Sequence, residues 1–187
     1  EAGVLLGGEG VRLAADGTEK VSRFLRDRDY ELEITDSRLA HLFRRGAAQV
    51  DVLAPDGVGE RANTRTLRPL RTIKVPGGTQ ALNRSSLIEV QSRDVRGSLP
   101  RPNLLGAILV KVRAIERDEV PNAQRSDVAL LLQLVRDPDE LASDLSRTEK
   151  GWLRRHEYFA DLGDPTWDGF HAEDPEQAAL VFRRLIA

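Results

Sequence analysis

Lys111, Arg125 and Asp127 are the residues whose types and spacing most directly suggest chemistry. Lys111 follows the apolar run LLGAILV, so we expect it at the end of a buried helical face. Arg125 and Asp127 open the next apolar segment, where the helix dipole favours a carboxylate in the first turn. Two adjacent antiparallel helices would bring Lys111 and Asp127 together. The pair is then either part of a functional site or a salt bridge that joins the two helices.

Asp51 is a second candidate, because it lies in the strand-like segment QVDVLAP. Period-two alternation places Val50, Val52 and Ala54 on one face of this segment and Asp51 with Leu53 on the other. A carboxylate is costly to bury unless it is paired or bound to a metal ion. Asp51 is therefore either a metal ligand or a solvent-facing residue of an antiparallel hairpin.

The segment GVLLGG predicts a buried strand that ends in the pair Gly7-Gly8. Such a pair can bring the backbone close to a phosphate, but glycines at strand ends also form ordinary turns. The histidines show no metal-ligand spacing. The sequence also contains neither the nucleophile motif G-x-S-x-G nor the phosphate loop G-x-x-x-x-G-K-[ST].

Composition narrows the class of protein. The 187 residues suffice for one domain with a substantial core, and the net charge of −2 gives no overall basicity for nucleic acid. Basic residues nevertheless cluster in RTLRPLRTIK and WLRRH. The absence of cysteine excludes disulfides, and no run is long enough to cross a bilayer. These features predict a cytoplasmic protein with no membrane partner.

The first part of the chain has mixed patterning. A helix is expected from Glu19 to about Arg28, with Val21, Phe24 and Leu25 on one face. YELEI alternates like a half-buried strand, and two strand-like runs around Arg45-Gly46 predict a hairpin. RTIKVPGG and SLIEVQS predict further short strands, with PGGTQALN turning between them.

The remainder is patterned as helices. Apolar residues recur at helical spacing from Leu104 to Ile115, with Pro102 suited to the first turn, and PNAQRSDVALLLQLV follows as a second apolar helix. A capping signal is combined with helical periodicity in three further segments: DPDELASDL, RTEKGWLRRHEYFADL and DPEQAALVFRRLI. We therefore expect an α/β (α+β) core over residues 1–98 and a helical part over residues 99–187 packed on it.

In this order, the segments resemble the nucleotidyltransferase superfamily, and most closely its AbiEii-like branch, the toxins of type IV toxin–antitoxin systems. The matching stretches cover most of the chain: VLLGG, GAAQVDVLAPDG and LLGAILVKVRAIERDEVPNAQRSDVALLLQLV. The resemblance implies a nucleotidyltransferase-like mixed sheet followed by helices. It also implies Mg²⁺- or Mn²⁺-dependent transfer of a nucleotidyl group from a nucleoside triphosphate (NTP) to RNA, such as tRNA, or to a protein.

The resemblance also assigns residues. Gly7 and Gly8 would touch the triphosphate, and Asp51 would be a metal ligand and help to activate the acceptor hydroxyl. Lys111 would neutralise charge on the triphosphate, with Asp127 positioning it. The implied catalytic residues are Asp51, Lys111 and Asp127, and the implied nucleotide-binding residues are Gly7, Gly8, Lys111 and Arg125. A cognate antitoxin is an implied partner, and the basic segment 61–74 could meet the backbone of an RNA acceptor.

The sequence departs from the family pattern at one point. The family requires a carboxylate pair, D-x-D or similar, about a dozen residues after the glycine pair, where this chain offers only Glu9 and Asp16. The nearest carboxylate-x-carboxylate, Glu31-Leu32-Glu33, follows the expected helix and would place both side chains on one face. Three explanations are open: the sequence lacks a segment that carries the pair, the protein binds nucleotide without transferring it, or the fold serves only for interaction.

Overall fold

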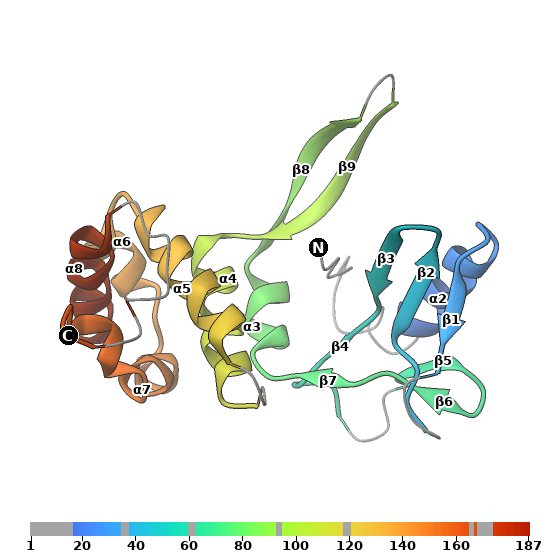
Figure 1. Ribbon diagram of the computed structural model, residues 1–187, viewed down its shortest axis with the longest axis horizontal. Helices are drawn as coiled ribbons and strands as arrows, with labels where there is room; N and C mark the ends of the chain where they lie inside the picture. Colours follow the sequence, from blue (N-terminus) through green and yellow to red (C-terminus); the bar gives the residue numbers. More distant parts are fainter. Residues whose placement is uncertain are drawn as a thin grey trace. The chain divides into compact units, whose positions relative to one another are not determined.

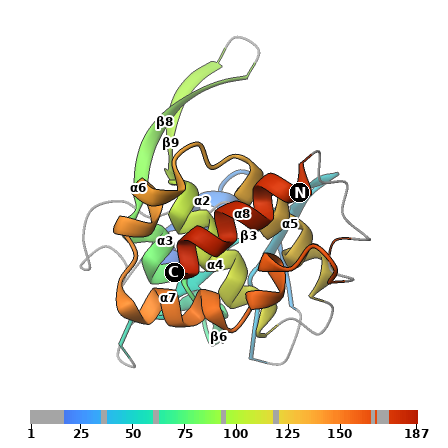
Figure 2. The same ribbon diagram turned by 90° about the vertical axis from the view of Figure 1, so that its left-hand side faces the viewer.

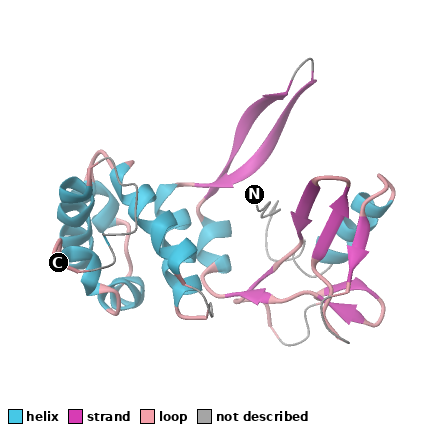
Figure 3. Ribbon diagram, viewed as in Figure 1, coloured by secondary structure: helices cyan, strands magenta, loops and turns pink. Residues whose placement is uncertain are grey.

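The computed structural model describes residues 17–34, 38–59, 63–92, 95–117, 121–164, 167 and 174–187. The chain divides into two compact units, Glu1–Arg101 and Pro102–Ala187. The strands of the first unit come before the helices of the second unit in the chain (Figure 3). A first part of small sheets followed by a mostly helical part confirms the mixed α and β class.

The described part of the first unit contains two helices and nine short strands (Figure 1). The helices are α2 (Gly17–Arg26) and α3 (Gly78–Asn83). The strands are β1 (Glu31–Glu33), β2 (Leu42–Arg45), β3 (Ala48–Asp51), β4 (Ala54–Pro55), β5 (Arg65–Leu67), β6 (Leu70–Arg71), β7 (Lys74–Val75), β8 (Ser85–Ser92) and β9 (Val95–Pro102). They form the sheets β1-β2-β3, β4-β7, β5-β6 and β8-β9, so these strands build separate small sheets where one mixed sheet was expected.

The predicted hairpin is confirmed as β2 and β3, whose antiparallel register pairs Arg45 with Ala48. Its turn contains Gly46 at a φ of 58°, a left-handed conformation that glycine adopts without strain. Phe43 and Val52 are buried together with Leu25 of α2, which also confirms the expected inward face of residues 50 and 52. This cluster fixes the strand that carries Asp51.

Hydrogen bonds from threonine hydroxyls to backbone carbonyls connect separate segments of the first unit. Thr18 at the start of α2 donates to the Arg65 carbonyl at 2.9 Å, and Thr66 donates to the Ala40 carbonyl at 2.6 Å. Thr72 donates to the carbonyl of Val52, the residue after Asp51. These bonds satisfy backbone carbonyls within or next to the short strands.

Three local predictions are wrong. PGGTQALN contains α3 rather than only a turn, because Asp56 accepts hydrogen bonds from the backbone N–H groups of Gly77 and Thr79 at the start of that helix. Pro102 ends β9, and Asn103 caps the next helix. Phe24 is 51% exposed, with the Arg28 guanidinium over its ring.

A helix is present in each segment predicted to be helical in the second unit, but RTEKGWLRRHEYFADL forms an α-helix and a separate 3₁₀ helix. The elements are α4 (Leu104–Ile115), α5 (Asn122–Gln133), α6 (Pro138–Ser143), α7 (Arg147–Arg154), the 3₁₀ helix η1 (Glu157–Ala160) and α8 (Pro175–Ile186). Figure 2 looks onto α8, which packs against α5, α6, α7 and η1. Leu105, Val128, Phe159 and Phe182 are among the side chains buried in this core.

Candidate functional site

Lys111 of α4 forms the centre of the candidate site. Its Nζ lies 2.6 Å from Asp127 Oδ2 and donates a hydrogen bond to Gln124 Oε1 at 3.1 Å, both on α5. The side chains of Lys111 and Asp127 are 37% and 45% exposed, so solvent reaches the pair. The expected approach of Lys111 and Asp127 is therefore present in the structure.

Helix geometry explains this arrangement. Gln124 and Asp127 are three residues apart on α5 and so lie on the same side of that helix. The α4 and α5 helices are in contact, and Ile108 and Val112 of α4 are buried in the same cluster as Val128 and Leu132 of α5. An ammonium group has three N–H donors, and the two acceptors engage two of them. The third can reach an anion from the solvent side.

Gln124 was not found from the sequence. A glutamine near the start of a helix carries no signal by itself, and its contact with Lys111 depends on how α4 and α5 pack. Only its spacing of three residues from Asp127 could have suggested that it faces the same side.

Arg125 has other contacts. Its Nη1 lies 3.5 Å from Asn122 Oδ1, and its guanidinium carbon lies 5.4 Å from the centroid of the Tyr158 ring in η1. Consecutive positions on a helix differ by about 100°, so Arg125 and Asp127 leave α5 in widely different directions. The structure brings Arg125 to η1, and its role in nucleotide binding stays a prediction.

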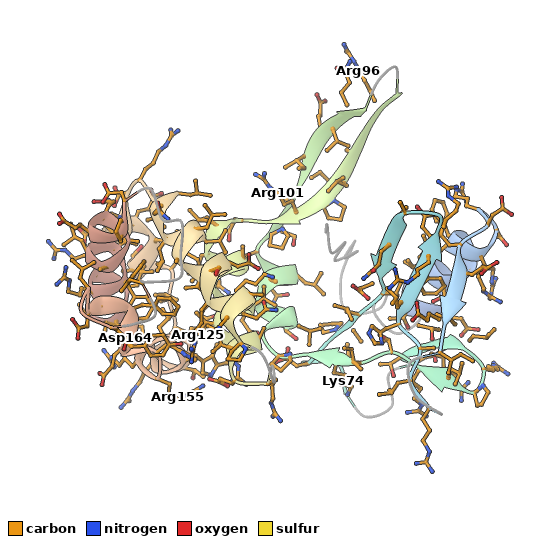
Figure 4. The ribbon with its side chains drawn as sticks, in the orientation of Figure 1. Lys74, Arg96, Arg101, Arg125, Arg155 and Asp164 are labelled. Atoms are coloured by element: carbon orange, nitrogen blue, oxygen red, sulfur yellow. The ribbon has the colours of Figure 1, made fainter. Side chains whose placement is uncertain are left out.

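Beside Arg125 lies a set of ionisable side chains that we call the Glu116 cluster: Arg113, Glu116, Arg155 and His156. Glu116 Oε1 accepts hydrogen bonds from Arg155 Nε at 2.9 Å and Nη2 at 2.7 Å, and the other carboxylate oxygen pairs with Arg113. His156 Nε2 lies 3.7 Å from Glu116 Oε1. Figure 4 labels Arg125 and Arg155 in this part of the helical unit.

Burial sets the protonation states here. Burial lowers the pKa of His156; Glu116 opposes this effect, and Arg155 and Arg125 reinforce it. Burial raises the pKa of the Tyr158 hydroxyl, against the opposing effect of the nearby Arg125 guanidinium. His156 is therefore a neutral imidazole at pH 7.

Asp51 ends β3 in the first unit, opposite Leu42 of β2. Its side chain is 33% exposed, and its Oδ1 lies 4.0 Å from His41 Nε2. Among the described residues there is no group of three or more histidine, aspartate or glutamate side chains that could hold a metal ion. Mg²⁺ is commonly held by one or two carboxylates together with water and substrate phosphates, so the role of Asp51 as a metal ligand stays a prediction.

The remaining predicted residues divide into two groups. Gly7, Gly8, Glu9 and Asp16 lie outside the described residues. Glu31 and Glu33 flank Leu32 in β1, and both are exposed. Glu33 Oε2 accepts a hydrogen bond from Arg44 Nε of β2 at 2.6 Å, an ordinary cross-strand ion pair.

Within the part of the chain that the structure describes, no helix combines the length and the hydrophobicity needed to cross a membrane. No family model, curated protein or solved structure matches the chain.

Proposed function

We propose that the protein binds an NTP through Lys111 and transfers its nucleotidyl group to an acceptor, as the resemblance to AbiEii-like nucleotidyltransferases implies. The observation that carries this proposal is the double support of the Lys111 ammonium by Asp127 and Gln124. An ammonium group held in this way is a fixed positive charge with one donor left for a phosphate oxygen.

Exposure favours this function over a purely structural salt bridge. Ion pairs between exposed side chains typically contribute about 0–1 kcal/mol to stability. Both members of the Lys111–Asp127 pair are more than one third exposed, and a second acceptor is present. The small contribution of such a pair to protein stability does not by itself explain why two acceptors bind the Lys111 ammonium at the surface.

The resemblance gives Asp51, in the first unit, the role of accepting the proton of the acceptor hydroxyl. The resemblance makes RNA, such as tRNA, or a protein the acceptor and suggests a toxin with a cognate antitoxin. It also implies Mg²⁺ or Mn²⁺, for which the described residues supply no complete set of ligands.

The same observation favours a second candidate, a relative that binds nucleotide without transferring it. Transfer at the α-phosphorus depends on neutralising the charge that develops there, for which metal ions held by carboxylates are the usual device. Nucleotide binding requires only cationic groups that contact the phosphates, and Lys111 is the residue proposed for this role.

Transfer of label from α-³²P-labelled NTPs to total tRNA, or to the protein itself, tests the proposal in buffer containing Mg²⁺. We expect transfer by the wild type and its loss in Lys111→Ala and Asp51→Asn. Lys150→Ala is the matched control, because the one described hydrogen bond of the Lys150 side chain is to the backbone carbonyl of Ala187. Transfer that survives both site substitutions would refute the site. Nucleotide-dependent thermal stabilisation without transfer would establish the second candidate.

A further inference from the structure

We propose that the β5–β6 hairpin of the first unit binds the phosphate backbone of a nucleic-acid duplex through Arg65, Arg68 and Arg71. In the proposed function this duplex would belong to the acceptor, and that part of the inference rests on the proposed function. The binding of a duplex by these arginines does not rest on it, because they belong to the first unit and Lys111 belongs to the second.

The stretch of chain that forms this hairpin is strongly basic. No aspartate or glutamate occurs between Glu60 and Glu89, although the whole chain has 30 acidic residues. The same stretch carries these basic residues: Arg61, Arg65, Arg68, Arg71, Lys74 and Arg84. A chain with a net charge of −2 therefore has a local excess of positive charge in this stretch.

Arg65 and Arg71 lie on the outer face of the hairpin that β5 and β6 form (Figure 1). They are directly opposite each other in the register of the two strands, so their side chains leave the sheet on the same face. Arg71 is exposed and Arg65 is half-buried, and Arg68, in the turn between the strands, is also exposed. The residues that flank Arg65 and Arg71 along the chain are buried: Thr64, Thr66, Leu70 and Thr72.

This arrangement places like charges together without a compensating acid. Like charges at directly opposite positions destabilise a sheet. In the described part of the chain, no ion pair involves Arg65, Arg68 or Arg71. Glu19, on the helix α2 that packs against β5, accepts a hydrogen bond from Asn63 Nδ2 at 2.7 Å. An anion bound between the two guanidinium groups would offset their repulsion.

Hydrogen bonds fix the backbone at both opposed arginines. The Arg65 carbonyl accepts a hydrogen bond from the Thr18 hydroxyl at 2.9 Å. The Arg71 N–H donates to the Arg38 carbonyl at 3.0 Å, and the Arg71 carbonyl accepts from the Ala40 N–H at 2.9 Å. The two side chains therefore start from fixed points, which reduces the conformational entropy lost when they bind an anion.

The composition around the hairpin favours a phosphate backbone as the ligand. Residues 61–101 contain no phenylalanine, tyrosine, tryptophan or histidine. Single-stranded nucleic acid is typically bound by stacking of its bases on aromatic side chains, and aromatic residues also dominate the binding energy of protein interfaces. Arginine instead presents a planar fork of N–H donors that matches phosphate oxygens. A duplex offers such phosphates without unstacked bases, so we expect binding that does not depend on its sequence.

Fluorescence anisotropy with labelled short RNA and DNA duplexes tests the inference, in the absence of any NTP and over a range of salt concentrations. The full-length wild type is compared with Arg65→Gln/Arg71→Gln and with Lys111→Ala. Arg183→Gln/Arg184→Gln is the matched control, because it removes the same charge from exposed positions of α8 in the second unit. The single strands of each duplex and polyglutamate serve as competitors.

We expect both duplexes to bind the wild type, because they share the phosphate backbone. Arg65→Gln/Arg71→Gln should bind at least about tenfold more weakly, the effect of losing charge-assisted hydrogen bonds. The slope of log affinity against log salt concentration should become shallower by about two, one for each lost phosphate contact. The control variant and Lys111→Ala should follow the wild type in both respects.

A stability measurement separates binding from a structural role. Because Arg71→Gln removes the repulsion between the opposed arginines, its free energy of unfolding in urea should equal or exceed that of the wild type. A clear loss of stability in this variant would overturn the inference. So would wild-type affinity of Arg65→Gln/Arg71→Gln for the duplexes, or a wild type that binds neither duplex.

The competitors and Lys111→Ala identify the ligand and separate the two proposals. Displacement of the duplex by polyglutamate or by single strands at equal charge would overturn a site for duplex phosphates. If Lys111→Ala binds NTPs as the wild type does, the proposed function fails. The loss of duplex binding in Arg65→Gln/Arg71→Gln would still establish the arginine site, because no NTP is present in that measurement.

Discussion

Substitution in the Lys111–Asp127 pair tests whether the pair serves nucleotide binding or the stability of the fold. Asp127→Asn removes the charge and keeps the shape of the side chain. Because the pair is substantially exposed, we expect the free energy of unfolding to fall by no more than about 1 kcal/mol. Nucleotide affinity should fall, because the lysine loses its stronger acceptor. Chemical denaturation and calorimetric titration measure the two effects. A large loss of stability with unchanged affinity would identify a structural salt bridge.

His156 gives the second unit a predictable response to acid. Its pKa in the folded protein lies below the ordinary value of 6.5, so between these two values the unfolded chain binds more protons. Stability should therefore be fully present above pH 6.5 and fall as pH decreases toward the lower, folded-state pKa. Denaturation curves of the wild type and His156→Gln measure this. The variant should lose less stability between pH 7 and 5, and parallel losses would contradict the assignment.

The cap at its N-terminus is the main local interaction that stabilises α7. Ser146 and Glu149 form a capping box in which the serine hydroxyl accepts from the Glu149 N–H and the carboxylate accepts from the Ser146 N–H. We expect Ser146→Ala to lower the free energy of unfolding by about 1 kcal/mol. Ser143→Ala is the control, because that hydroxyl bonds only to a carbonyl one turn back in α6. Equal effects in urea denaturation would show that the cap contributes nothing.

The sequence predicts elements well where their determinants are local. Apolar spacing predicts α4 from Leu104 to Ile115, and Asn103, Asp137, Ser146 and Asp174 cap helices through bonds to residues three positions ahead. By contrast, α3 depends on Asp56, a residue about twenty positions earlier in the chain, which local patterning does not reveal.

The same distinction holds for the site. Lys111 and Asp127 could be paired from the sequence because α4 and α5 are consecutive helices. The Glu116 cluster could not, since its contacts join Glu116 to Arg155, almost forty residues later. The periodicity of apolar residues does not indicate which charged residues from distant segments of the chain will lie close together.

At the scale of the whole molecule, the buried clusters differ in size between the described parts of the two units. The buried cluster around Phe43 in the first unit includes Leu25 and Val52, whereas α4, α5, α7, η1 and α8 all contribute to the larger cluster of the second. Because apolar burial supplies most of the stabilisation, we expect the first unit to open at the lower free energy. Amide exchange should be slower in α4 and α8 than in β1–β3. The reverse order would contradict this interpretation.

The central claim is that Lys111 is a nucleotide-binding residue, and calorimetric titration of ATP, GTP, CTP and UTP into Lys111→Ala and Lys150→Ala tests it most directly. We predict that the wild type and Lys150→Ala bind at least one of these nucleotides with the same affinity. Lys111→Ala should bind it at least about tenfold more weakly, the effect of losing a charge-assisted hydrogen bond. Equal affinity of the two variants for every nucleotide, or no binding by the wild type, would contradict the claim.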